Sequence, residues 1–454
     1  MLSSIGRFLR ACLRAIQLTL PKIGIGWMFA LLTSNFNRIA IYELGVLAVL
    51  VTTMIGLYHF LSPFQVFFGR LADRRPIFGF RRSPYLLLGL LVSSAVFPLL
   101  PSVAVAMGRG SLAAVLAGFA LLLLFGVGFA AAGSAHLALI ADTTTERSRG
   151  LVVALVWTVQ IASVIVSAAV MKALMPSYDP AAMQRLYNYT PAIALASGAL
   201  AVLGLERRLR GHDLAATVAA ARAVGPQGGA LAAALGLLRG NRVVRAFFGF
   251  IICSTLGVFL QDTILEVFGA EVLHMSVRET TSFQQIWGGG VLGAMLLAGA
   301  LASFVPVNKK LVAAIGGVGT TAGLLLLTGA ALSASRALIW PALIVMGVFT
   351  GLYTLGALST MMELTVEGAT ATYMGLWGLA QALGNGLSAV AAGALHSALI
   401  DSGLLAAGAG YAAIFAIEAG LMFAGVILLG GVDVAEFRGL SRSDITHALE
   451  LEAA

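Results

Sequence analysis

The sequence predicts an all-α membrane protein with twelve transmembrane helices. Only 11% of its 454 residues are charged and 59% are hydrophobic, far from the composition of soluble domains. Long apolar runs recur along the chain, and about 20 residues suffice for a helix to cross the hydrocarbon core. The length of the runs and their lack of alternation exclude membrane-spanning strands. The mean hydropathy of +0.95 supports the same class.

The basic residues predict the orientation. All but six of the 28 Lys and Arg fall in alternate gaps between the apolar runs. The six exceptions are Arg38, Arg109, Lys172, Arg185, Arg278 and Arg336. Because cytoplasmic loops retain Lys and Arg, this bias predicts a bacterial inner-membrane protein with both termini in the cytoplasm. Loops that face anionic headgroups then account for the net charge of +8, and nucleic-acid binding is not expected.

The expected spans follow one another in two sets of six. The first set is 23–42, 46–69, 84–107, 113–140, 150–175 and 190–205, and the second is 244–265, 280–304, 311–331, 337–360, 372–399 and 411–431. An amphipathic segment, 1–22, precedes them, with Arg7, Arg10 and Arg14 on one helical face, so we expect an interfacial helix there. A basic, partly helical linker, 206–243, joins the halves 23–205 and 244–431, and a cytoplasmic tail, 432–454, follows.

A weak internal repeat relates the two halves. At an offset of 221 residues, the segments after the fourth and tenth spans place acid on acid and amide on amide. The pairs are Asp142 with Glu363, Glu146 with Glu367, and Gln160 with Gln381. Parallel repeats of this kind occur in transporters that are built from two similar halves.

The loop between the second and third spans is a candidate gating element. It reads GRLADRRPIFGFRRSPY and contains Gly69, Asp73 and Arg74, with an insertion at 76–80. Gly69 permits close helix approach, and Asp73 can bind a helix end or an arginine and so hold one conformation. The alternative is a solvated basic loop that only fixes the topology.

Polar groups inside the spans are functional candidates because they are costly in lipid. Two clusters end the first and seventh spans: Asn37, Arg38 and Glu43, and Gln261, Asp262 and Glu266. Arg38 could pair with an acid of the other half, or the clusters could be outer-surface loop residues. Glu418, midway along the last span, is either a proton-coupling group or a hydrogen-bonded structural glutamate.

Two histidines lie within spans, His59 in the second and His136 in the fourth. A neutral imidazole can ligate the magnesium of a chlorophyll-type pigment, and the alternative for each is hydrogen-bonded packing. The sequence contains no serine triad, metal-ligand spacing or nucleotide-binding loop, so an enzyme is not expected. The two cysteines, Cys12 and Cys253, imply neither a disulfide framework nor a metal site.

Several segments together resemble the bacteriochlorophyll-delivery family, the PucC/LhaA-type branch of the major facilitator superfamily. They are NRIAIYELGV, LYHFLSPFQVFFGRLAD with GFRRSPY, LQDTILEVFGAEVL with TTSFQQIWGGGVLG, and YMGLWGLAQALGNGLS. The resemblance implies the superfamily fold, with twelve transmembrane helices in two six-helix halves. It also implies delivery of (bacterio)chlorophyll to light-harvesting antenna complexes and help with their assembly, in a photosynthetic membrane.

The resemblance further implies the partners. These are membrane lipid, antenna polypeptides, and (bacterio)chlorophyll or its synthesis enzymes, with bound pigment in place of a covalent cofactor. Lipid-facing grooves with aromatic anchors such as Trp287 and Trp377 are expected to hold pigment or antenna helices. The competing hypothesis is a proton-coupled secondary transporter of a small amphipathic solute, with Glu418 or Asp262 carrying the proton.

Overall fold

The computed structural model describes residues 12–62, 64–223, 238–302, 308–364 and 370–433, and the single positions Gly236, Phe304 and Phe437. Within these residues the chain is helical, and an isolated bridge between Ile77 and Phe80 is the only β pairing. The chain divides into two compact units. Unit 1 comprises Met1–Val46, Leu57–Gly225 and Met275–Gln285, and unit 2 comprises Leu47–Gly56, Pro226–His274 and Ile286–Ala454.

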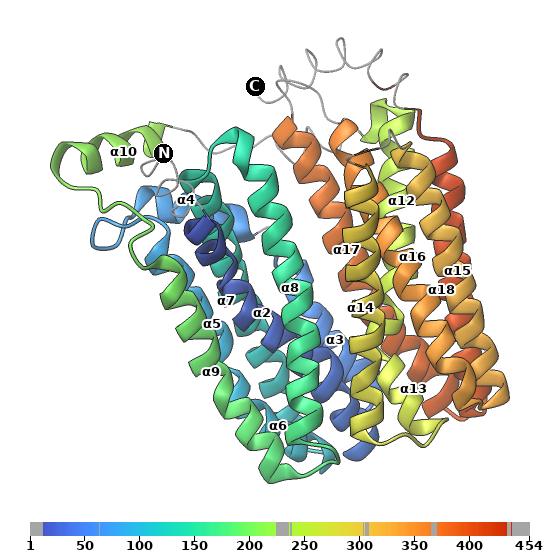
Figure 1. The fold of residues 1–454 in the computed structure, drawn as a ribbon. Coiled ribbons are helices and arrows are strands. Elements are labelled where there is room, and N and C mark those ends of the chain that lie inside the picture. Colours follow the sequence, from blue (N-terminus) through green and yellow to red (C-terminus); the bar gives the residue numbers. More distant parts are fainter. Residues whose placement is uncertain are drawn as a thin grey trace. The chain divides into compact units, whose positions relative to one another are not determined.

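Unit 1 begins with one long helix, Cys12–Glu43, which contains α2 (Pro21–Ala30) and two π-helical stretches, η1 (Leu31–Phe36) and η2 (Ile39–Glu43). The other helices are α4 (Phe64–Arg74), α5 (Ser83–Ala95), η3 (Phe97–Leu99), α6 (Leu100–Gly108), α7 (Leu112–Thr143), α8 (Glu146–Leu174), α9 (Pro180–Val202) and α10 (Gly211–Ala223). In this unit α5 packs on α7 and α9, and α2 packs on α8 and α9 (Figure 1). The amphipathic segment 1–22 is described only from Cys12, where the chain is helical and continuous with the first span.

Unit 2 contains α12 (Arg242–Phe259), the 3₁₀ turn η4 (Gln261–Thr263), the short helix α13 (Leu265–Glu271), α15 (Lys309–Ser333), α16 (Arg336–Glu363), α17 (Thr370–His396), the π-helical η5 (Ser397–Asp401) and α18 (Ala407–Gly430). Two helices pass from one unit to the other along their length, α3 (Ala48–Phe60) and α14 (Val277–Ala302). In unit 2, α15 packs on both α16 and α18, and α12 packs on α17 and α18.

Each expected span coincides with a helix, but the count of twelve crossings stays a prediction. Of the described helices, nine are long and apolar enough to cross a membrane, or ten if α3 and α4, bent by 44°, form one span. The other two, α9 and α14, are 23 and 26 residues long and have several polar residues in their first halves. α9 begins at Pro180, well before the predicted residue 190, because the side chain of Asp179 caps its first amides.

The surfaces of both units are apolar. Leucines on the long helices are largely exposed, among them Leu116 at 62%, Leu151 at 76% and Leu297 at 75%. Apolar exposure on this scale is typical of helices that face lipid. Aromatic side chains fill the interiors, with Phe97, Phe125 and Tyr187 buried in unit 1.

Candidate functional site

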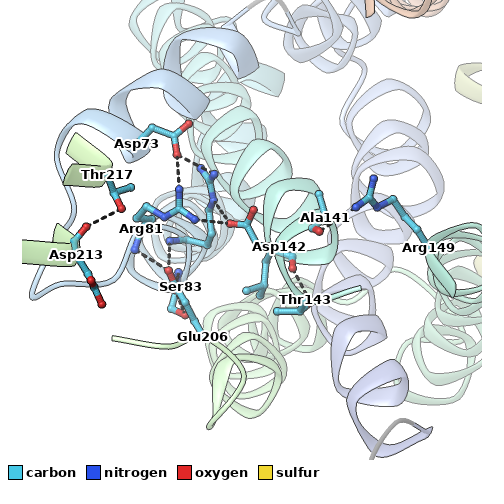
Figure 2. Close-up of polar contacts among 12 residues, drawn as sticks. Asp73, Arg81, Ser83, Ala141, Asp142, Thr143, Arg149, Glu206, Asp213 and Thr217 are labelled. Atoms are coloured by element: carbon cyan, nitrogen blue, oxygen red, sulfur yellow. Dashed lines mark hydrogen bonds and ion pairs between the residues drawn. The ribbon is translucent and has the colours of Figure 1, made fainter. Parts of the chain in front are cut away.

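Charged side chains gather at one end of unit 1, where α4 meets α5, α7 meets α8, and α9 leads into the linker. We call this the linker end. Arg82 binds Asp73 at 2.8 Å and Asp142 at 3.0 Å. Arg81 binds the same two acids at 3.4 and 3.1 Å. Figure 2 shows Asp73, from α4, and Asp142, from α7, both joined to Arg81, which precedes α5. The four charges therefore join three helices.

Glu206, the first residue of the predicted linker, completes this cluster. Its Oε1 accepts hydrogen bonds from the amides of Arg81 and Arg82 at 2.6 and 2.9 Å. Its Oε2 accepts from the amide and hydroxyl of Ser83 at 2.7 and 2.6 Å (Figure 2). The start of α5 has no cap from its own side chains, and a carboxylate there satisfies free amides and complements the helix dipole. The linker thus supplies the cap of α5.

The insertion at 76–80 forms a tight turn that also binds the linker. Phe78 and Gly79 have positive φ angles of 53° and 82°. The amide of Leu209 donates to the carbonyl of Gly79 at 2.9 Å, and Nε of Arg208 donates to the carbonyl of Phe78 at 2.8 Å. The insertion at 76–80 is therefore part of the surface on which the linker docks.

The three predicted gating-loop residues have separate surroundings. Asp73 pairs with arginine, which was one of its two predicted roles. A Cβ on Gly69 would lie 3.0 Å from the hydroxyl of Ser134, so this glycine does permit close approach of α4 and α7. Nε of Arg74 donates to the carbonyl of Ala221 near the end of α10 at 3.2 Å. With Arg82 only 8% exposed, the loop is more than a solvated basic segment.

Of the residue pairs related by the internal repeat, the acids make similar ion pairs and the amides differ in burial. Asp142 ends α7 and pairs with arginines before α5, and Glu363 ends α16 and pairs with Lys309 at the start of α15, at 2.6 Å. The amides differ, since Gln160 is half-buried and Gln381 is exposed. Glu367 and the side chain of Glu146 lie outside the described residues.

Arg38 lies in the first helix of unit 1 and is only 2% exposed. Its guanidinium binds Oε1 of Glu43 at 2.8 Å and donates to the carbonyl of Met275 at 3.2 Å. The carboxylate partner recorded for Arg38 is thus Glu43, of its own unit, and not an acid of the second half. Asn37 beside it is buried. The π-helical turns η1 and η2 flank both residues, and π-bulges often occur at functional sites.

Glu418 is fully buried midway along α18 in unit 2, whose end opposite the linker we call the far end. There α12 gives way to η4, and the amide of Gln261 donates to Oε1 of Glu418 at 2.9 Å. Its other oxygen has no hydrogen-bond partner among the described residues. Of the remaining acids of this cluster, Glu266 is buried and Asp262 is half-buried. The hydrogen bond fits a structural role for Glu418, and the second oxygen leaves a proton-coupling role open.

The two intramembrane histidines differ. Nε2 of His136 lies 2.7 Å from the carbonyl of Leu18, and the ring is 1% exposed, so this histidine is packed and hydrogen-bonded. His59 is half-buried, and its ring has no recorded hydrogen bond to any described residue. Its imidazole stacks on Tyr58 with centroids 3.9 Å apart, and Tyr58 contacts Phe125 and Phe129. Of the two rings, that of His59 is the less buried and the one without a recorded hydrogen bond.

The aromatic anchors also differ. Trp377 is fully buried and packs edge-on against Phe247 with centroids 4.7 Å apart. Its predicted lipid-facing position is wrong, because this face of α17 packs on α12 in the interior of unit 2. Trp287 is half-buried, and its indole nitrogen has no hydrogen-bond partner among the described residues.

Four side chains of the polar clusters were not singled out from the sequence. Arg81 and Arg82 could have been found from the sequence, because they form the second pair of basic residues in the loop. Glu206 opens the run ERRLRGHD, but its acceptor role depends on a segment more than 120 residues away. His396 ends α17 and binds acids from two other segments, without any local motif.

These features define a polytopic membrane protein with the fold of the major facilitator superfamily. Among solved structures, a variant of the nucleoside transporter NupG matches with a TM-score of 0.68 at 13% identity, over 92% of this chain and 99% of that chain. That likeness concerns the fold alone. The family described as PUCC protein matches residues 35–437, and the chain belongs to this family.

Curated relatives agree with this assignment. A protein named PucC from Cereibacter sphaeroides is 28% identical over 92% of this chain and 91% of its own length. A Rhodobacter capsulatus protein named bacteriochlorophyll synthase 44.5 kDa chain is 30% identical over 84% of this chain and 87% of its own length. The family resemblance seen in the sequence segments is thereby confirmed.

Proposed function

We propose that the protein delivers (bacterio)chlorophyll to light-harvesting antenna complexes and assists their assembly in a photosynthetic inner membrane. Membership of the PucC family supports this role, and so do the bacteriochlorophyll-related names of its relatives. The role involves pigment binding and antenna contacts, without catalysis by this chain. Its partners are antenna polypeptides, membrane lipid, and the pigment or the enzymes that supply it.

The observation that carries the proposal is the environment of His59. A neutral imidazole whose ring has no recorded hydrogen bond could ligate the magnesium of the pigment. Tyr58 stacks on this imidazole and in turn contacts Phe125 and Phe129, so His59 lies at the edge of an aromatic cluster. Phe60 and Phe64, close by in the sequence, are 37% and 49% exposed, so the surroundings are open to a lipid-soluble molecule.

The test is to purify the tagged protein gently from its native, pigment-producing membrane. We expect a red-shifted chlorophyll-type absorption band and antenna polypeptides in the mass-spectrometric partner list. His59→Leu should lose most of the pigment. His136→Leu is the matched control, since it should retain pigment but unfold at a lower temperature. A colourless wild-type protein without antenna polypeptides would overturn the proposal.

The second candidate function is proton-coupled transport of a small amphipathic solute. Glu418 favours it, because a fully buried carboxyl group with one unbound oxygen among the described residues is suited to carry a proton. This function predicts solute flux that collapses with the proton gradient and with Glu418→Gln. A purely structural scaffold would show neither flux nor pigment.

A further inference from the structure

The loop between α4 and α5 contains a tight turn whose most exposed side chain is aromatic. Ile77 and Phe80 exchange two backbone hydrogen bonds of 2.9 Å around the central residues Phe78 and Gly79. Phe78 is 80% exposed, although basic pairs precede and follow the turn in the sequence. In Figure 1 the turn belongs to the light-blue loop beside α4, at the linker end of unit 1. A large apolar ring is therefore presented within a strongly basic loop.

The backbone of the turn makes phenylalanine an unusual choice. Phe78 and Gly79 both have positive φ angles, as in the two-residue hairpin turns that favour Asn-Gly, Asp-Gly or Gly-Gly. A bulky residue is strained at positive φ. The turn is nevertheless fixed from outside, because Nε of Arg208 donates to the Phe78 carbonyl and the Leu209 amide donates to the Gly79 carbonyl. An exposed ring is thus retained on a strained, hydrogen-bonded turn, and strain of this kind points to a function.

The turn is surrounded by arginines with unused hydrogen-bond donors. Arg75, Arg208 and Arg210 are all exposed. Among the described residues, the side chains of Arg75 and Arg210 have no recorded hydrogen bond or ion pair, and Arg208 is recorded only through its Nε. The acids of the Arg81–Arg82 cluster are already bound to those two arginines and to the start of α5. The excess positive charge around Phe78 therefore complements an anionic partner.

The depth of the turn identifies that partner. The turn ends at Phe80 and α5 begins at Ser83, while α9 ends at Val202 and the linker reaches the turn at Leu209. The turn therefore lies at the level where the helices of unit 1 end. Headgroup layers widen the bilayer from about 30 Å of hydrocarbon to about 40–45 Å, so residues just beyond helix ends meet lipid headgroups. The cytoplasmic leaflet, which the charge bias predicts on this side, contains anionic lipids.

We propose that Phe78, with Arg75, Arg208 and Arg210, forms a binding site for anionic phospholipid at the linker end of unit 1. The ring of Phe78 inserts below the headgroups, and the guanidinium groups donate hydrogen bonds to the lipid phosphates. Burial of the ring in lipid would compensate for the strained backbone of the turn. Because the same turn binds the linker, the site would make linker docking sensitive to the charge of the membrane. This role depends neither on pigment nor on Glu418.

The experiment places 4-fluorophenylalanine at position 78 of the full-length protein in nanodiscs of phosphatidylcholine, with or without phosphatidylglycerol. Dissolved oxygen relaxes a ¹⁹F nucleus in the hydrocarbon, and a water-soluble nickel complex relaxes one in the aqueous phase. The same label at Phe423, which is 49% exposed midway along α18, is the reference for a ring in lipid. With phosphatidylglycerol present, the label at position 78 should respond to oxygen as the reference does. A label that responds mainly to nickel in these nanodiscs would overturn the proposal.

Two arginine variants test the role of charge. Arg75→Gln removes a cation whose side chain has no recorded contact with the turn, so the turn should be retained. One basic residue near an anionic surface changes membrane binding by about fivefold, so the ratio of immersed to aqueous rings should fall by about that factor. Arg109→Gln is the matched control, since Arg109 is exposed at the opposite end of unit 1 and should leave the ratio unchanged. Equal immersion with and without phosphatidylglycerol, or no effect of Arg75→Gln, would exclude recognition of anionic lipid.

Discussion

The linker ends of the two units hold their helices together with different numbers of charges. In unit 1, Arg81 and Arg82 each bind Asp73 and Asp142, whereas in the described part of unit 2 one pair, Lys309 with Glu363, is recorded between the corresponding ends of α15 and α16. Arg82 is 8% exposed and Lys309 is 48% exposed. A buried arginine with two acids is screened little, and an exposed lysine is screened strongly.

The two units share one kind of ion pair, and unit 1 has further recorded charged contacts. Asp142 and Glu363 occupy equivalent positions in the repeat, and both link the end of one helix to the start of another. Unit 1 adds Asp73 from α4 and the capping carboxylate of Glu206 from the linker. The extra charges bind the loop of the predicted gating element, so rearranging the linker end of unit 1 requires breaking several interactions.

Removing Arg82 should have the largest effect on stability. Arg82→Met leaves the carboxylates of Asp73 and Asp142 with only the half-exposed Arg81, and we expect a loss of about 2–3 kcal/mol. The control is Lys309→Met, which removes the equivalent cation of unit 2 and should cost less than about 1 kcal/mol. Thermal unfolding in lipid nanodiscs measures both, and equal shifts would contradict the proposed difference between the units.

Gly79→Ala should disrupt the docking of the linker on the 76–80 turn of unit 1. Among the described residues, such docking is recorded for this unit. A Cβ there would clash with the carbonyl of Leu209, and alanine is also strained at a φ of 82°. We expect a cost of about 1–2 kcal/mol and faster hydrogen exchange at the Leu209 amide. Gly204→Ala is the matched control, since Gly204 also has a positive φ, 68°, but no atom within 4 Å of its Cβ position. Equal exchange in both variants would indicate strain alone.

Glu206→Gln should weaken the start of α5 by about 1 kcal/mol, the usual value of a helix cap. The new amide nitrogen would face the Ser83 amide, in place of an oxygen that accepts from it. Unit 2 provides the comparison, because α15 is capped by its own Asn308, which accepts from the Leu311 amide at 3.1 Å. Asn308→Ala should speed exchange at Leu311 only. If Glu206→Gln left exchange at Ser83 unchanged, the linker would not be the cap.

The fold was predictable because apolar runs of membrane-crossing length dominate the sequence. The ends of the helices were harder to predict. The run of polar residues in the first half of α9 hid its start, although Asp179 and Pro180 form an ordinary capping signal. The bend between α3 and α4 was also missed, since hydropathy along 46–69 does not report a change of direction.

The candidate site was predictable where the signal was local. Asp73 was found from its loop, and Asp142 from the repeat, but their shared arginines were not, because shared binding depends on how α4, α5 and α7 pack. The position of Trp377 was predicted wrongly for the same reason, because hydropathy does not show which face of α17 is buried. The same reason also explains why His396 was missed, since its acidic partners lie 125 residues before it and five residues after it.

The smallest effect is expected at the Lys309–Glu363 pair. Glu363→Gln should cost no more than about 0.5 kcal/mol, because both side chains are partly exposed and solvent screens the pair. The difference from wild type should vanish in about 1 M salt, where the Debye length falls to about 3 Å. Asp142→Asn should retain most of its effect at that salt concentration, because it disturbs the buried Arg82. Thermal unfolding of both variants at low and high salt therefore tests the central distinction: if salt removed the two effects equally, the linker end of unit 1 would be no better shielded than that of unit 2.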